Sequence, residues 1–335
     1  MLHVIDRKYH TDSKIFNNIY IVPDIRFFTL YALFNGIFEY HQLSAEDVST
    51  PRLELMYDVQ HAASGLDEQT LLRWQAYYTA HKTHIWSYIY YTSYCSLPPT
   101  FEVCRDTVTD ATYKKAIDAL ENFDLLLADF YEKCGIEQLY FEKYKSLLLN
   151  YIDAYDEKNI YHDIDYVHTY LRVPKPAQST MNIVIVPIPF ESHFMGYGAA
   201  QKNKLYLFES IGAQTQGLNI HEYLHSFVNP AVESVDTLDS TYVAEVFEEQ
   251  RSKEWILTDY GELRTFVSEN FVRAITYRII TQLYGKQNLC FDELSQYGLV
   301  LVKHIYAKLQ QEYEVNTEDF RNIKQFIHYF INTYH

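Results

Sequence analysis

Apolar residues recur at helical spacing through most of the first half of the chain. Residues 24–41 and 70–94 place them on one face of a predicted helix. Residues 109–155 predict two helices that break near Gly135, because glycine disfavours a helix interior. Prolines mark the connections between these elements, and they are Pro51, Pro98, Pro99, Pro174 and Pro176.

The pattern changes after the last of these prolines, where β-branched residues replace the helical period. Residues 182–190 predict one strand and residues 205–210 a second, with the turn-rich segment 195–198 between them. Pro187 and Pro189 predict that the first strand lies at a sheet edge or in an irregular position, because proline cannot donate a ladder hydrogen bond. The strands therefore predict a small sheet, mixed or antiparallel.

Helical spacing returns after the second strand. A helix over residues 218–228 is expected to end at Pro230, with Asn219 or Thr215 as its N-terminal cap. More helices are predicted near residues 241–258, 263–284 and 291–313, and a last one from the capping-type sequence that starts at Asn316.

Composition and charge narrow the class of protein. The content of 48% hydrophobic and 21% charged residues fits a soluble globular chain. The formal net charge of −16 disfavours nucleic acid as a partner, because such binding needs Lys and Arg on the phosphates. No stretch of about 18 apolar residues predicts a membrane span, and the N-terminus lacks the apolar run of a signal peptide. We expect a cytoplasmic location for the sequence as it stands, and export if a leader precedes it.

The four cysteines, Cys95, Cys104, Cys134 and Cys290, form no C-x-x-C pair, which disfavours a thiolate zinc site. A different metal motif is present, because His221, Glu222 and His225 form an H-E-x-x-H sequence. On a helix, two histidines four residues apart share one face and can bind the same Zn²⁺. The glutamate after the first histidine is then placed to act on a zinc-activated water.

Zinc needs a third protein ligand, and two glutamates qualify. Glu245 lies 20 residues after His225, and this short spacing favours it. Glu269 lies 44 residues after His225, in an otherwise apolar helix and four residues before Arg273. A carboxylate in such surroundings needs partners, which a metal ion and Arg273 would provide. The residues themselves leave both alternatives open.

A zinc ion with two neutral histidines and one carboxylate would lower the pKa of a bound water towards about 7. Glu222 would be the general base that takes the proton from this water and passes it to the leaving amine. The strand at 205–210 would pair with an extended substrate, and Asn229 is expected to close the motif helix. The expected donors to the developing oxyanion are Tyr197, His193, Tyr242 and Arg273.

Residues 221–230, which read HEYLHSFVNP, resemble the H-E-x-x-H-S-F-V-N-P signature of an uncharacterised bacterial family of gluzincin-like zinc metallopeptidases, a domain of unknown function. Residues 51–55, 190–198 and 269–275 resemble other parts of that family, so the resemblance spans about residues 50 to 335. A glutamate in an E-x-x-V-R-A helix is the natural third ligand there, which implies Glu269. Family members often carry an export signal, which this sequence does not show, and no substrate comes with the resemblance.

Together these observations predict an α+β, mostly helical fold. Residues 1–178 would form a mainly helical N-terminal region and residues 179–335 a zincin-like catalytic region, packed together as one compact unit. The predicted function is zinc-dependent hydrolysis of a peptide or protein substrate. The alternatives are a non-catalytic zincin-like binding protein, with a structural or vestigial metal site, and a hydrolase of non-peptide amides or esters. The oligomeric state stays open.

Overall fold

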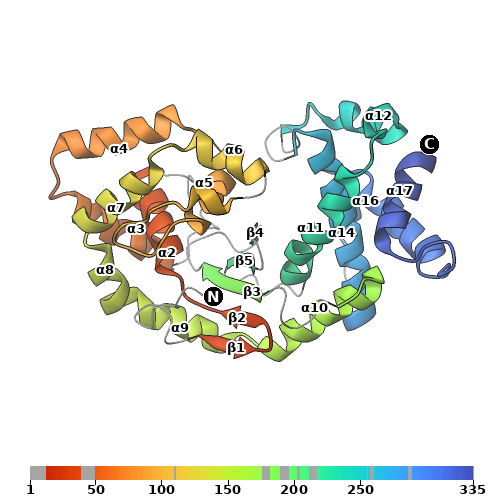
Figure 1. The fold of residues 1–335 in the computed structure, drawn as a ribbon, viewed down its shortest axis with the longest axis horizontal. Helices are drawn as coiled ribbons and strands as arrows, with labels where there is room; N and C mark the ends of the chain where they lie inside the picture. The colour runs from red at the N-terminus through yellow and green to blue at the C-terminus, as the bar shows by residue number, and fades with distance from the viewer. Residues whose placement is uncertain are drawn as a thin grey trace. The chain divides into compact units, whose positions relative to one another are not determined.

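The chain divides into two compact units in the computed structural model (Figure 1). Unit 1 comprises Met1–Glu157 with Gln178–Gln214, and unit 2 comprises Lys158–Ala177 with Thr215–His335. The predicted strands thus belong with the N-terminal residues rather than with the motif helix. The structure describes residues 13–38, 50–83, 85–108, 111–175, 182–188, 196–201, 204–210, 217–254, 256, 260–285 and 289–334.

Helices make up most of unit 1. The predicted stretch 70–94 forms two helices, because the first one ends at His81. The predicted break at Gly135 is confirmed, since this residue has a φ of +59° and precedes a new helix. The helices are α2 (Ile25–Leu33), α3 (Thr50–Ala63), α4 (Glu68–Ala80), α5 (Ile85–Ser93), α6 (Ala111–Ala119), α7 (Phe123–Lys133), α8 (Ile136–Leu139) and α9 (Lys145–Ala154), with the π-helical segments η1 (Phe34–Phe38) and η3 (Tyr140–Tyr144) and the 3-10 segment η2 (Arg105–Thr107).

The core of unit 1 is built from aromatic rings carried by these helices. Phe34 packs edge-on against Tyr88 with 4.9 Å between ring centroids, and Phe28 packs against Tyr140 at 5.1 Å. Phe27 joins this core to the sheet through Phe208, at 4.4 Å. Ring pairs in such arrangements add stability beyond the burial of their area. The aromatic content of the sequence is thus used for packing here.

The sheet of unit 1 is mixed and has the strand order β1-β2-β3-β5-β4. Its middle strand pairs in parallel with both neighbours, while the outer pairs are antiparallel. The prediction of a small mixed sheet in a mostly helical α+β fold is confirmed. The strands are β1 (Lys14–Phe16), β2 (Ile19–Ile21), β3 (Asn182–Ile188), β4 (Gly196–Gln201) and β5 (Lys204–Ser210).

Two predictions about these strands were wrong. β5 pairs with β3 on one side and β4 on the other, so its backbone groups are used and it cannot add a substrate strand. β3 is an internal strand and not an edge, although it contains Pro187. Proline is tolerated because β2 pairs only with residues 183–185, so at Pro187 the described ladder has a partner on one side alone.

The described residues of unit 2 form helices joined by turns and loops, with no strand among them. The helix predicted over residues 263–284 is confirmed at both ends, whereas the stretch 291–313 is divided. The last helix begins after Asn322, which caps it, because Asn316 instead caps a turn at Asp319. The elements are α10 (Glu157–Leu171), α11 (Leu218–Glu233), η4 (Leu238–Ser240), α12 (Tyr242–Gln250), α14 (Leu263–Tyr284), α15 (Phe291–Gln296), α16 (Val302–Lys308), η5 (Leu309–Tyr313) and α17 (Ile323–Thr333).

The motif helix α11 lies beside α14 (Figure 1). Its N-cap is Gly217, with a φ of +119°, so neither Asn219 nor Thr215 is the cap that the sequence predicted. A Cβ at Gly217 would lie 2.3 Å from Cδ1 of Ile280 on α14, which would have to repack, and the positive φ strains any residue other than glycine.

The motif helix also continues through Pro230, where the sequence predicted its end. Proline lacks one N–H, but the following amides keep their helical bonds, and the Ser234 N–H still donates to the Pro230 carbonyl at 3.2 Å. The extra turn keeps Asn229 inside the helix. None of the described helices combines the length and the apolar character that crossing a bilayer requires.

Candidate metal centre

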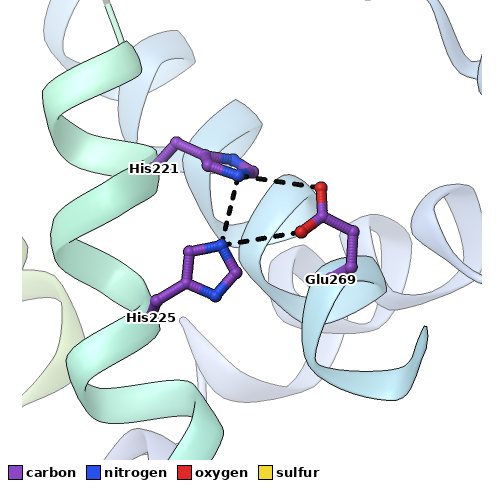
Figure 2. Close-up of side chains that lie close together, drawn as sticks. All are labelled: His221, His225 and Glu269. Atoms are coloured by element: carbon purple, nitrogen blue, oxygen red, sulfur yellow. Dashed lines mark hydrogen bonds and ion pairs between the residues drawn. The ribbon is translucent and has the colours of Figure 1, made fainter. Parts of the chain in front are cut away.

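Three donor groups meet between α11 and α14, all of them in unit 2 (Figure 2). His221 and His225 project from one face of α11, and Glu269 projects toward them from α14. The two Nε2 atoms are 3.3 Å apart. Oε1 of Glu269 lies 3.6 Å from His221 Nε2, and Oε2 lies 3.5 Å from His225 Nε2.

These separations suit a small tetrahedral cation. Bonds of about 2.0 to 2.1 Å at tetrahedral angles place neighbouring ligand atoms about 3.4 Å apart. The observed donor separations of 3.3 to 3.6 Å lie close to this value. The donor set of two imidazoles and one carboxylate is also one that zinc uses. The three side chains therefore form a group that could hold a small tetrahedral cation, and zinc is one such cation.

The pKa values of His221 and Glu269 favour the protonation states that a metal requires. Burial lowers the pKa of His221 to about 3, helped by His225 and Arg273 and opposed by Glu269. Burial alone would raise the pKa of Glu269, but Arg273 and the two histidines outweigh it and hold that pKa at about 2. At neutral pH the His221 ring is therefore neutral and the carboxylate is ionised.

Arg273 holds the Glu269 carboxylate from the next turn of α14. Its Nε donates to Oε1 of Glu269 at 2.5 Å, and its Nη2 donates to the Tyr260 hydroxyl at 3.4 Å. Burial would lower the pKa of Arg273, but the Glu269 charge and Tyr260 keep it above its usual value. The predicted pairing of these two side chains is confirmed. The role of Arg273 as a donor to the transition state stays a prediction.

The structure separates the two glutamates that the sequence left open. Glu269 is buried and faces both histidines, whereas Glu245 is exposed on α12. The short spacing to Glu245 looked favourable only because a sequence does not show which helix packs against the motif helix. Here that helix is α14.

The structure gives less information about the other predicted catalytic residues. Glu222 is buried on α11, 4% exposed, and its action as a base stays a prediction. Tyr197 lies on β4 of unit 1, in register with Phe208, and its side chain is outside the described residues, as is all of His193. The ring of Tyr242 is 40% exposed and packs against Tyr334.

Two side-chain contacts of α11 were missed by sequence reasoning. His225 Nδ1 lies 3.1 Å from Oδ1 of Asn229, so the prediction that Asn229 closes the helix was wrong. The four-residue spacing could have indicated this contact, but Pro230 pointed to a helix end. On another face of α11, the Tyr223 hydroxyl lies 2.8 Å from Nε2 of His168 on α10. This bond ties the motif helix to α10.

Comparison with known proteins finds one family for this region. Residues 207–333 match the model of a domain of unknown function, DUF4932. The matched residues include α11 and α14 and therefore all three donors. No curated protein and no solved structure matches the chain. The expected relation to a family of unknown function is thus supported over residues 207–333, and the match carries no gluzincin-like activity with it.

Proposed function

We propose that the protein is a zinc-dependent peptidase whose metal ligands are His221, His225 and Glu269. The observation that carries this proposal is a three-donor cluster with zinc-like spacing that solvent still reaches. The side chains of His221 and His225 are 16% and 24% exposed. Within the described part of the chain no fourth His, Cys, Asp or Glu joins the group. Three ligands with one open position are typical of catalytic zinc.

The chemistry divides between the ion and the side chains. Zinc bound here would polarise a carbonyl and lower the pKa of a water molecule. Glu222 would take a proton from the attacking water and pass it to the leaving amine. Arg273 would keep the Glu269 carboxylate ionised and oriented through its bond to Oε1. A peptide or protein is the proposed substrate, because metallopeptidases use the H-E-x-x-H motif to place two metal-binding histidines beside a glutamate that acts as the base.

The experiment measures metal content and hydrolysis on the same full-length protein. We expect about one zinc per chain and cleavage of members of a mixed peptide library. Glu222→Gln should keep the zinc and lose about 100- to 10,000-fold in rate, because it removes the proton acceptor but no ligand. Glu233→Gln is the matched control, since Glu233 is exposed on the same helix, and it should leave both readouts unchanged.

Other outcomes would redirect or reject the proposal. Zinc bound with no cleavage of any peptide, and cleavage of a small amide or ester, would favour a non-peptide hydrolase. Zinc bound with no hydrolysis at all would favour the non-catalytic binding protein. A folded protein that binds no zinc would reject the metal site itself.

A further inference from the structure

The His225 ring has a second polar contact in addition to the donor cluster. Figure 2 shows one of its nitrogens directed at His221 and Glu269 and the other directed away from them. The nitrogen directed away is Nδ1, and it lies 3.1 Å from the side-chain oxygen of Asn229. We infer that Asn229 is a positioning residue of the metal centre, which fixes the tautomer and the orientation of His225. This inference rests on the proposed metal site.

The helix places Asn229 for this role. Residues 221, 225 and 229 follow each other at intervals of four, so they stack along one face of α11. This holds because α11 continues through Pro230 to Glu233. The C-terminus of the helix is instead satisfied by the Ser234 N–H, which donates to the Pro230 and Val232 carbonyls. Asn229 is thus one turn too early to act as the cap.

The contact determines which nitrogen can bind a metal. A neutral imidazole carries one N–H, and an amide oxygen can only accept. Donation to Oδ1 of Asn229 therefore requires the proton on Nδ1 of His225, which would leave the lone pair on Nε2. Nε2 is the atom that lies 3.3 to 3.5 Å from the other two donor groups. A ligand held in the correct tautomer loses less entropy when the metal binds.

The choice of a neutral amide also affects the charge of the centre. Arg273 already balances the charge of Glu269 through its 2.5 Å bond. A carboxylate at position 229 would add a negative charge, make His225 a stronger donor and hold a cation more tightly. Asn229→Asp should therefore keep a hydrogen-bond acceptor for Nδ1 of His225. Asn229→Leu removes the acceptor and replaces it with an apolar side chain of similar size.

The first test needs no metal and no activity. Long-range proton–nitrogen NMR correlations report the tautomer of His225 in the metal-free protein, at a pH well above the ordinary imidazole pKa of about 6.5. We expect the Nδ1–H form alone in the wild type and in Asn229→Asp, and a mixture of tautomers in Asn229→Leu. Wild-type protein with a tautomer mixture would overturn the inference.

The second test measures zinc affinity by competition with a chromophoric chelator. Asn229→Leu should bind zinc roughly 10- to 100-fold more weakly, and Asn229→Asp at least as tightly as the wild type. Asn332→Leu is the matched control, because Asn332 is an exposed asparagine on α17 whose side chain bonds to the His328 carbonyl. It should leave zinc affinity unchanged. Equal affinity in Asn229→Leu and the wild type would overturn the inference.

The two tests separate this inference from the proposed function. A fixed tautomer in a protein that binds no zinc would reject the metal site and keep the contact to Asn229. Tight zinc binding without hydrolysis would reject the peptidase and leave the positioning role intact. If Asn229→Leu fails to fold, the wild-type spectrum and the affinity of Asn229→Asp still decide the question.

Discussion

Two buried glutamates, one in each unit, have pKa values that are shifted in opposite directions. Glu209 on β5 is 5% exposed and Glu269 on α14 is 4% exposed, so water is excluded from both almost equally. Burial raises the pKa of Glu209 to about 7, and a hydrogen bond from Tyr155 opposes this shift. The pKa of Glu269 is about 2 despite the same burial.

The difference comes from the neighbours of each carboxylate. Glu209 accepts a hydrogen bond from the neutral Tyr155 hydroxyl, and its Oε1 has no hydrogen-bond donor among the described residues. Glu269 has the Arg273 cation at 2.5 Å and two imidazoles. Burial therefore favours the protonated form of a glutamate, whereas a neighbouring cation holds it in the ionised form that binds a metal. Burial alone does not identify a ligand.

The largest expected effect is a loss of zinc affinity when Glu269, but not Glu209, is replaced. Glu269→Gln should cost about 3 to 5 kcal/mol, roughly a third of the 10 to 16 kcal/mol typical of a zinc site, because it removes one of three ligands. Glu209→Gln replaces an equally buried carboxyl in the other unit and should leave the affinity unchanged. Chelator competition measures both, and equal losses would refute the comparison.

The second largest effect is expected when Arg273 is replaced, because this cation lies beside Glu269 and accounts for its lower pKa. Arg273→Met should destabilise the metal-free protein by roughly 3 kcal/mol, because it leaves a buried carboxylate without its partner. Zinc should restore much of this loss, since the ion becomes the new positive partner of Glu269. Urea unfolding with and without zinc measures the effect. No extra stabilisation by zinc in the variant, compared with the wild type, would contradict the expectation.

A pH effect distinguishes the carboxyl of Glu209. Its pKa is about 7 in the folded protein and 4.5 in the unfolded chain, so the unfolded chain loses its proton first as pH rises. The contribution of Glu209 to stability is complete below about pH 4.5 and is lost by about pH 7, a change of at most about 3.5 kcal/mol at 1.4 kcal/mol per pKa unit. Glu209→Gln should lack this contribution. Urea unfolding of both proteins at several pH values gives it as their difference, and parallel pH profiles would contradict it.

The smallest expected effect concerns the donor to Glu209. Tyr155→Phe should cost about 1 kcal/mol, because it removes one buried hydrogen bond. It should also raise the pKa of Glu209 further, since that bond lowers it. Unfolding below the Glu209 transition measures the first effect, and the midpoint of the pH dependence measures the second. Tyr151→Phe, on α9, is the control, and an equal effect there would show a general loss of packing.

The sequence predicted the helices where their signals are local. The helix over residues 263–284 was predicted at both ends, and the break at Gly135 followed from glycine itself. The position of strands in the sheet depends on partners distant in the chain, so the strand at 205–210 was wrongly expected to be free to pair with a substrate. Pro230 misled because it removes one hydrogen bond, whereas packing of α11 against α14 and α17 keeps the helix intact.

The candidate site also combines features that depend on local sequence with features that depend on distant partners. The spacing of His221 and His225 is a property of one helix, so it could be read directly. Glu269 was favoured over Glu245 by its apolar surroundings and by the family resemblance, and the structure brings it to the histidines. Asn229 was missed because its role depends on whether the helix continues past Pro230.

The glycine at the start of α11 bears on how closely the two ligand-bearing helices approach each other. The histidines come from one helix and the carboxylate from the other, so the packing of α11 against α14 sets the donor spacing. A methyl group at Gly217 would meet Cδ1 of Ile280 at 2.3 Å, so this side chain would have to repack. The φ of +119° at Gly217 also strains any residue other than glycine. A residue that binds no ion, four positions before the first ligand, thus helps to hold the two parts of the donor set together.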